Sequence, residues 1–261
     1  MPPYTDAVWQ SLRQDAAVLA GREPALAGFV HTTVLTHGRF EDALSFLLAK
    51  KLGGKFLSPM QARDFIKEAI AADPEIAVAA RADLVAIRER NPACRSHLEA
   101  FLFYKGYHAL EIHRLAHWFW NNKRYAIALM LLSRISRLFA VDIHPAARIG
   151  KGVMIDHASG VVIGETAEVG DDVSMLHAVT LGGTGKQAGD RHPKIRQGVL
   201  LSVGATVLGN IEIGEQSRVG AGSVVLTPVP PNMSAVGVPA HLAVRQDRNA
   251  PAKTMDHTGD A

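Results

Sequence analysis

Hydrophobic residues in the second half of the chain recur every six positions, from about residue 141 to residue 225. This period fits neither an α-helix, with 3.6 residues per turn, nor a strand with alternating sides. It fits a short strand followed by a tight corner, with three such units in each coil, which is a hexapeptide parallel β-helix. The aliphatic positions that predict its stacked core are Ile143, Ile149, Ile155, Ile163, Val169, Met175, Leu181, Ile195, Leu201, Val207, Ile213, Val219 and Val225.

Two interruptions of this spacing mark candidate functional loops. The step from Ile155 to Ile163 is eight residues instead of six, so the corner at 156–159 carries two extra residues. The step from Leu181 to Ile195 is fourteen residues, so a loop with eight extra residues lies at 182–193. Each insertion contains a histidine, and loops on a rigid scaffold often carry chemistry. Surface insertions with incidental histidines are the alternative, because such insertions cost little free energy.

Residues 4 to about 140 show the apolar spacing of helices. The fold class is therefore α + β: an all-helical N-terminal domain, residues 1–140, followed by a β-helix domain, residues 141–240. Residues 241–261 are polar, and we expect them to form a mobile tail. The predicted helices include 40–52, 59–72 with Ser58 as N-cap, 75 to about 90, 98–121 and 123–140.

Composition narrows the classes of function. The content of 48% hydrophobic and 20% charged residues is that of a globular protein, and a net charge of +3 gives no reason to expect nucleic acid binding. No apolar run is long enough to span a membrane, and the N-terminus lacks a secretory signal. The single cysteine, Cys94, excludes an internal disulfide and favours a cytoplasmic protein. His113 and His117 lie four residues apart but lack a His-Glu-x-x-His pattern, so we assign them to packing and expect no metal.

Several motifs resemble the serine O-acetyltransferases, a family of the hexapeptide-repeat acyltransferases. The most specific are Asp156-His157-Ala158 in the first insertion and Gly189-Asp190-Arg191-His192-Pro193 in the second, and the resemblance covers nearly the whole chain. It implies a left-handed β-helix and a homotrimer or a dimer of trimers. It also implies transfer of an acetyl group from acetyl-CoA to the hydroxyl of L-serine, which gives O-acetyl-L-serine and CoA in the first step of cysteine biosynthesis from serine.

The resemblance also implies a role for each residue of the site. These roles are general base for His157, orientation of its ring for Asp142, a contact to the substrate hydroxyl for His192, pairing with the serine carboxylate for Arg191, contacts to the ammonium for Asp156 and Asn91, and backbone contacts to CoA near Gly183, Val203 and Ala221.

Elementary chemistry agrees with these roles. A positioned histidine that removes the hydroxyl proton contributes about 10²–10⁴-fold to the rate. A carboxylate behind its imidazole fixes the tautomer, and a planar guanidinium binds a carboxylate through two parallel hydrogen bonds. Because Cys94 is the only thiol and lies outside both insertions, we favour direct transfer in a ternary complex over an acyl-enzyme.

Two positions depart from the pattern of the family. Asn91-Pro92 stands where Asp-Pro is common, so one charge for the serine ammonium is missing. We expect weaker serine binding and weaker feedback inhibition by L-cysteine, which uses the same pocket in this family. Many members end in an isoleucine that enters the active site of O-acetylserine sulfhydrylase, whereas this chain ends in Ala261. Each missing buried methylene forfeits about 0.8 kcal/mol, so we expect a weak complex or none.

Other functions remain open at this stage. The acceptor could be another hydroxyl, such as that of homoserine or a sugar, although Arg191 favours an amino acid carboxylate. A γ-class carbonic anhydrase shares the scaffold and could place zinc on His157, His177 and His192, but it leaves the Asp-Arg-His loop unexplained. A non-catalytic scaffold is the third alternative.

Overall fold

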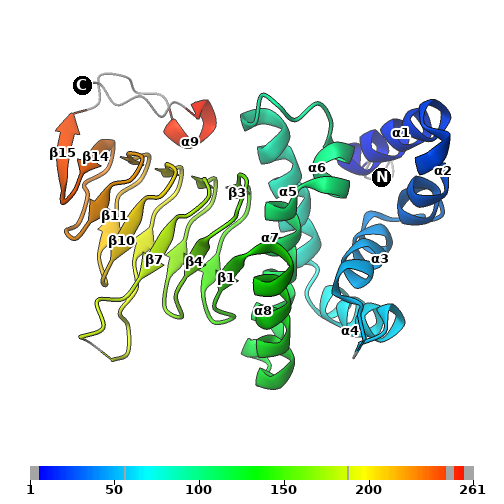
Figure 1. The fold of residues 1–261 in the computed structure, drawn as a ribbon, viewed down its shortest axis with the longest axis horizontal. Coiled ribbons are helices and arrows are strands. Elements are labelled where there is room, and N and C mark those ends of the chain that lie inside the picture. The colour runs from blue at the N-terminus through cyan, green and yellow to red at the C-terminus, as the bar shows by residue number, and fades with distance from the viewer. Residues whose placement is uncertain (1–5, 56, 187, 245–249, 256–261) are drawn as a thin grey trace, which may run out of the picture.

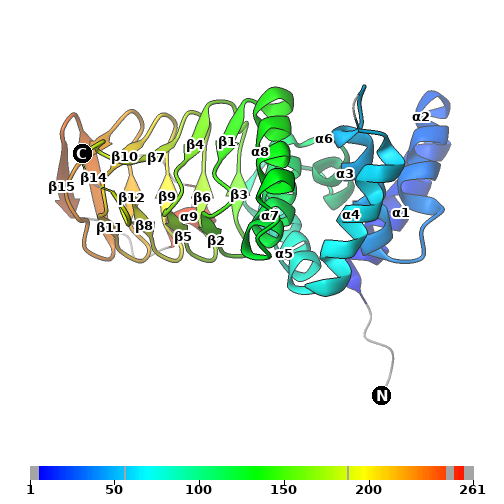
Figure 2. The same cartoon turned by 90° about the horizontal axis from the view of Figure 1, so that it is seen from below.

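The computed structural model describes residues 6–55, 57–186, 188–244 and 250–255. A helical part and a β-helix lie end to end, with α7 and α8 at the boundary between them (Figures 1 and 2). This confirms the predicted fold class, a helical domain followed by a parallel β-helix. The helices are α1 (Ala7–Arg22), α2 (Pro24–Val30), a π-helical segment (His31–Leu35), α3 (Phe40–Leu52), α4 (Pro59–Ala72), α5 (Glu75–Arg90), α6 (His97–Phe103), α7 (Lys105–Asn121), α8 (Tyr125–Phe139) and α9 (Pro251–Thr254).

Local signals account for several helix ends. The Ser58 hydroxyl accepts from the backbone N–H of Gln61 at 3.2 Å, and the Gln61 side chain accepts from the backbone N–H of Ser58 at 3.0 Å. This reciprocal cap starts α4 where it was predicted.

The prediction of one helix over 98–121 is wrong, because the chain is extended at Tyr104 (φ −83°, ψ 112°) and α7 starts anew at Lys105. The break lets Gly106 approach β3 so closely that a Cβ there would lie 2.0 Å from the Ile155 carbonyl oxygen.

The β-helix consists of short strands in three parallel sheets. Sheet A has the order β1-β4-β7-β10-β13, sheet B has β11-β8-β5-β2, and sheet C has β15-β14-β12-β9-β6-β3, of which only the β14–β15 pair is antiparallel. The strands are β1 (Val141–Ile143), β2 (Arg148–Ile149), β3 (Met154–Ile155), β4 (Val161–Ile163), β5 (Glu168–Val169), β6 (Ser174–Met175), β7 (Thr180–Gly182), β8 (Lys194–Ile195), β9 (Leu200–Leu201), β10 (Thr206–Leu208), β11 (Glu212–Ile213), β12 (Arg218–Val219), β13 (Val224–Val225), β14 (Met233–Gly237) and β15 (Ala240–Val244).

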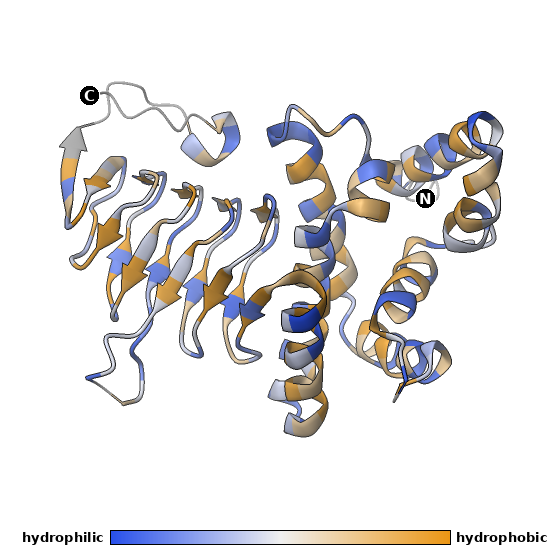
Figure 3. Cartoon of the chain, viewed as in Figure 1, coloured by the Kyte–Doolittle hydropathy of each residue, from blue (hydrophilic) through white to orange (hydrophobic). Residues whose placement is uncertain are grey.

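The predicted aliphatic positions form the core of the coils. All thirteen lie in strands, and all but the partly buried Ile149 are fully buried. They align from coil to coil, as in the column Ile143, Ile163, Leu181, Val207 and Val225 of sheet A. Hydrophobic segments accordingly follow the strands through the whole stack (Figure 3). The spacing therefore predicts both the strands and their register.

A buried charge cluster fixes the helical domain to the first coil. Arg114 of α7 donates to Asp83 of α5 at 2.5 Å and to the carbonyls of Ile149 and Gly150 at 3.2 and 2.7 Å. The other oxygen of Asp83 accepts from the backbone N–H of Val153 at 2.7 Å. Because these bonds join α5 and α7 to the start of the β-helix, they set the position of both helices relative to the coil corners.

Part of the C-terminal stretch also packs on the β-helix. Pro251 and Ala252 of α9 are buried, and the Ser174 hydroxyl donates to the Ala252 carbonyl at 2.7 Å. The remainder of the predicted tail, residues 245–249 and 256–261, lies outside the described residues. No helix in the described ranges is both long and apolar enough to cross a membrane.

Candidate active site

The first insertion changes the backbone at one corner of the β-helix. Ala140, Gly160, Ala178, Gly204 and Gly222 precede the strands of sheet A, and each has a positive φ between 57° and 77°. A left-handed residue at this corner is therefore part of the architecture. The first insertion adds two further residues with positive φ to its coil, His157 (φ 56°) and Ala158 (φ 61°). Such conformations are costly outside glycine and cluster at functional sites.

His157 lies at the mouth of a cavity of about 450 Å³ between the two domains. The last turn of α5 brings Asn91 to this cavity, and the close approach of α7 brings Tyr104 and Lys105. The His157 imidazole is largely exposed, and its Nε2 lies 3.5 Å from Asp156 Oδ2. A partly buried carboxylate and an accessible imidazole thus share one small cavity.

Asn91 is held in a defined orientation beside Asp156. Its side-chain oxygen accepts from the backbone N–H of Ala93 at 2.9 Å, which places its amide nitrogen toward the carboxylate. That nitrogen donates to Asp156 Oδ1 at 3.1 Å, and the backbone N–H of His157 donates to the same oxygen at 3.1 Å. The structure thus places Asn91 beside Asp156, and their joint contact to the serine ammonium stays a prediction.

Asp142 is implied by the family resemblance to orient the His157 ring. It lies in the middle of β1, with an exposed side chain on the outer face of sheet A and Val162 as its neighbour on β4. Within the described residues no hydrogen bond joins it to His157, whose carboxylate neighbour is Asp156. An orienting role for Asp142 stays a prediction.

The second insertion places its functional residues at a different corner. Arg191 donates to Glu165 Oε2 at 2.7 Å, and this bond lowers the pKa of the Glu165 carboxyl. His192 is buried beside Thr166, and burial together with the Arg191 charge lowers the pKa of its imidazole. His157 precedes β4 and Glu165 follows it, so about 13 Å of extended chain separates the two corners within one subunit.

The comparisons with known proteins identify the family of this chain and agree with its fold. Residues 8–112 match the family model described as serine acetyltransferase, N-terminal. The serine acetyltransferase of Escherichia coli K12 is 49% identical over 95% of this chain and 91% of its own length.

This chain belongs to the serine acetyltransferase family.

Solved structures support the same assignment. The serine acetyltransferase of Vibrio cholerae superposes with a TM-score of 0.95 at 49% identity, covering 96% of this chain and 97% of that one. The soybean enzyme complexed with serine has a TM-score of 0.90 at 53% identity, covering 93% of this chain and 100% of that one. One further serine acetyltransferase structure, 47% identical, is a complex with cysteine, and another, from Brucella abortus and 46% identical, is a complex with coenzyme A. The chain is thus an acyltransferase that acetylates serine with acetyl-CoA as co-substrate, and the alternative functions find no support.

The predicted CoA contacts are divided between the two corners. Val203 and Ala221 lie at the same corner as His157, in the coils that follow it. Backbone hydrogen bonds link this corner from coil to coil, from Ala178 to Ser159, from Gly204 to His177 and from Gly222 to Val203. Gly183 lies at the other corner instead, where a Cβ would come within 3.5 Å of the Arg191 carbonyl oxygen and 3.6 Å of His192 Nε2.

Several residues at the two corners were not assigned from the sequence. Lys105 donates to the Ser159 hydroxyl at the edge of the His157 cavity. The His177 ring lies edge-to-face with the His157 ring, at a centroid distance of 5.7 Å. Glu165 and Thr166 hold Arg191 and His192. Their contacts join residues of different elements and have no signature in the spacing of the sequence.

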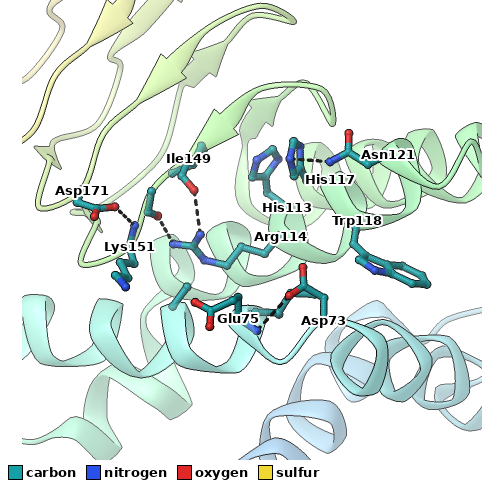
Figure 4. Close-up of a pocket in the computed structure, with 13 residues that line it drawn as sticks. Asp73, Glu75, His113, Arg114, His117, Trp118, Asn121, Ile149, Lys151 and Asp171 are labelled. Atoms are coloured by element: carbon teal, nitrogen blue, oxygen red, sulfur yellow. Dashed lines mark hydrogen bonds between the residues drawn. The ribbon is translucent and has the colours of Figure 1, made fainter.

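Another cavity, of about 390 Å³, lies at the domain junction (Figure 4). His113 and His117 of α7 line it together with Arg114, and the His117 Nδ1 bonds with the Pro145 carbonyl at 2.8 Å. Burial lowers the pKa of both rings, as expected for histidines that pack between domains. Among the residues described, no group of three or more His, Cys, Asp or Glu side chains is arranged to hold a metal ion.

Proposed function

We propose that acetyl transfer from acetyl-CoA to L-serine takes place at the His157 corner, with His157 as the general base. The supporting observation is the cavity itself, which brings an accessible imidazole within 3.5 Å of a carboxylate that is only 21% exposed. Asp156 and Asn91 bind the serine ammonium in this proposal, and His157 takes the hydroxyl proton.

Direct transfer is part of the proposal. Cys94 is buried, its Sγ lies 3.3 Å from the Ser96 carbonyl, and burial raises the pKa of its thiol. A protonated, buried thiol is a poor nucleophile. The hydroxyl oxygen of serine therefore attacks the acetyl carbonyl carbon itself.

We further propose that each site is completed by a second copy of the chain. Serine spans only a few ångströms, so Arg191 and His192 cannot reach a substrate held at Asp156 of the same subunit, about 13 Å of chain away. The outer face of sheet A lies between the two corners and carries Val162, which is 42% exposed. The neighbouring helix α8 adds exposed Tyr125, Leu129 and Leu138. The exposed apolar side chains beside Asp142 on this face fit a homotrimer in which one subunit's His157 corner meets the next subunit's His192 corner.

CoA then lies along the interface, against the column of Val203 and Ala221 from one subunit and near Gly183 of the next. The co-substrate would reach His157 from the coils that follow it.

L-Cysteine, which differs from serine only by sulfur in place of the hydroxyl oxygen, is proposed as an inhibitor at the same corner. The free thiol Cys94 fits the cytoplasm as the location.

Release of CoA thiol from acetyl-CoA and L-serine tests the assignment of the base. His157→Ala should lower serine-dependent release by about two orders of magnitude or more. The matched control is His31→Ala, which removes an exposed histidine of the helical domain. Full activity of His157→Ala would contradict the assignment of the base.

Mixing two inactive variants tests the shared site. After joint unfolding and reassembly, His157→Ala and His192→Ala subunits should regain about a quarter of wild-type activity, because a quarter of the interfaces combine two intact corners. A mixture that stays as inactive as its components would show that each site lies within one subunit.

A further inference from the structure

Thr166 surrounds one side of the His192 ring with hydrogen bonds. Its backbone N–H donates to His192 Nδ1 at 3.2 Å, and its hydroxyl oxygen lies 2.9 Å from the same nitrogen. The hydroxyl oxygen also accepts from the backbone N–H groups of Arg191 and His192, at 3.0 and 3.1 Å. Thr166 therefore contacts the loop residues through both its backbone and its side chain.

These bonds determine which nitrogen of His192 carries the proton. A hydroxyl has one hydrogen and two lone pairs, and both lone pairs of Thr166 are taken by backbone donors. Its hydrogen is available to Nδ1 and to the Asp190 carboxylate, whose pKa is lowered by hydrogen bonds from Lys194 and, in part, from the Thr166 side chain. The backbone N–H of Thr166 can only donate, and it donates to Nδ1 at 3.2 Å. Since Nδ1 accepts this bond, the proton of the neutral ring lies on Nε2.

The Nε2 side of the ring packs closely against Gly164. A Cβ on Gly164 would lie 2.0 Å from His192 Nε2, so no other residue fits there, whereas a Cβ on Gly183 would lie at an ordinary contact distance of 3.6 Å. Burial and the neighbouring Arg191 charge lower the pKa of His192, which favours the neutral ring at pH 7. The ring thus offers an N–H donor, and it does so without a net charge.

We propose that Thr166 is a positioning residue that holds His192 in the Nε2–H tautomer, so that His192 donates to the reacting oxygen and leaves the role of base to His157. This inference deepens the proposed function and rests on it. The serine oxygen forms a bond to the acetyl carbon while its proton passes to His157, and the carbonyl oxygen gains negative charge. The C–S bond then breaks, and the CoA thiolate takes up the proton from His157. A fixed N–H donor near the oxygens is useful throughout, whereas an Nδ1–H tautomer would offer a lone pair there.

The tautomer can be measured directly in the protein without substrate. Long-range ¹H–¹⁵N correlation of [¹⁵N]histidine-labelled protein distinguishes the two nitrogens, with the His192 signals assigned by their loss in His192→Gln. We expect a protonated Nε2 and an unprotonated Nδ1 in the wild type and in Thr166→Ser. In Thr166→Val, which keeps the backbone donor but loses the hydroxyl, the protonated Nε2 should lose population. A wild-type ring with its proton on Nδ1 would refute the inference, even if Thr166→Val fails to fold.

Kinetics provide a second, independent readout. Thr166→Val should lower kcat by about 10–100-fold with the acetyl-CoA KM within about 3-fold of wild type, since one donor to a developing oxyanion is misplaced. Thr166→Ser should recover most of this loss, and Thr227→Val, at an exposed threonine of the same β-helix, should have no effect. A folded Thr166→Val enzyme with wild-type kcat would overturn the inference.

Replacement of His192 itself separates the two nitrogens chemically. Glutamine can place an amide N–H near the Nε2 position, whereas asparagine reaches only the Nδ1 position. His192→Gln should therefore retain at least about 10-fold more kcat than His192→Asn. The opposite order would contradict the donor role. A wild-type enzyme without serine-dependent turnover would refute the proposed function alone, because the tautomer is measured without substrate.

Discussion

Replacing Asn91 by aspartate adds one negative charge to the substrate cavity and hardly changes the shape of the side chain. This substitution therefore tests how the charge of the cavity affects ligand binding. In Asn91→Asp, the amide group that donates to Asp156 Oδ1 at 3.1 Å becomes a second carboxylate oxygen. The backbone N–H of Ala93 keeps its acceptor, at 2.9 Å in the present structure, so the orientation of the side chain should persist. Two carboxylates then face each other across the place proposed for the ligand ammonium.

The expected gain is that of one new charge-assisted hydrogen bond. The wild-type side chain turns an N–H donor toward Asp156, and its only acceptor is the oxygen already bonded to Ala93. A bond to a charged group contributes about 1.5–3 kcal/mol, which corresponds to roughly 10–150-fold tighter binding. Repulsion between the two carboxylates in the free enzyme favours a shared proton at low pH, so the gain should shrink as the pH falls.

The assay compares the serine KM and the cysteine Ki of Asn91→Asp and wild type at saturating acetyl-CoA. Both constants should fall together, because the ammonium is common to the two ligands. Binding of 3-hydroxypropionate, which lacks the ammonium, should be unchanged or weaker in the variant. Unchanged constants for both amino acids, or equal tightening of 3-hydroxypropionate, would refute the reasoning.

Two further outcomes are expected. Cys94→Ala should keep kcat within about 2-fold if transfer is direct, and a folded but inactive variant would indicate an acyl-enzyme. Burial lowers the pKa of His108 to about 3, so at pH 5 the unfolded chain binds a proton that the folded chain excludes, and stability falls by about 2 kcal/mol relative to pH 7. Urea titrations should show His108→Gln losing this difference; an equal acid loss in the variant would argue against it.

The fold could be predicted from the sequence because its main signal is local and repeated. Six-residue spacing fixes both the strand and its register, since each coil must bury the same position as the last. The exception among the helices shows the limit of local signals. Residues 98–121 have no proline or cap that announces the break at Tyr104. The break exists because Gly106 approaches a β-strand about fifty residues away in the sequence, and such a contact leaves no trace in helical periodicity.

The sequence names candidate residues for the site but does not give their arrangement. The two insertions and their motifs identified His157, Asp156, Arg191 and His192 because the spacing breaks there. The spacing does not show that the insertions lie at opposite edges of sheet A, since this depends on which of the three corners each break falls in. Thr166 was missed for a related reason: its role comes from stacking against a residue one coil away.

The helical domain lines the candidate site together with the β-helix. It supplies Asn91, Tyr104 and Lys105 to the cavity in which the β-helix places Asp156 and His157. These side chains meet only if α5 and α7 keep their position on the first coils. Buried ion pairs suit this purpose, because removing one partner leaves an uncompensated charge and costs about 3–5 kcal/mol. Two ion pairs hold the helices in place, Arg114 with Asp83 and Arg90 with Asp172. Arg90 lies one residue before Asn91. The same residues that join the domains therefore also fix the distance between Asn91 and Asp156, on which binding of the serine ammonium depends in the proposed mechanism.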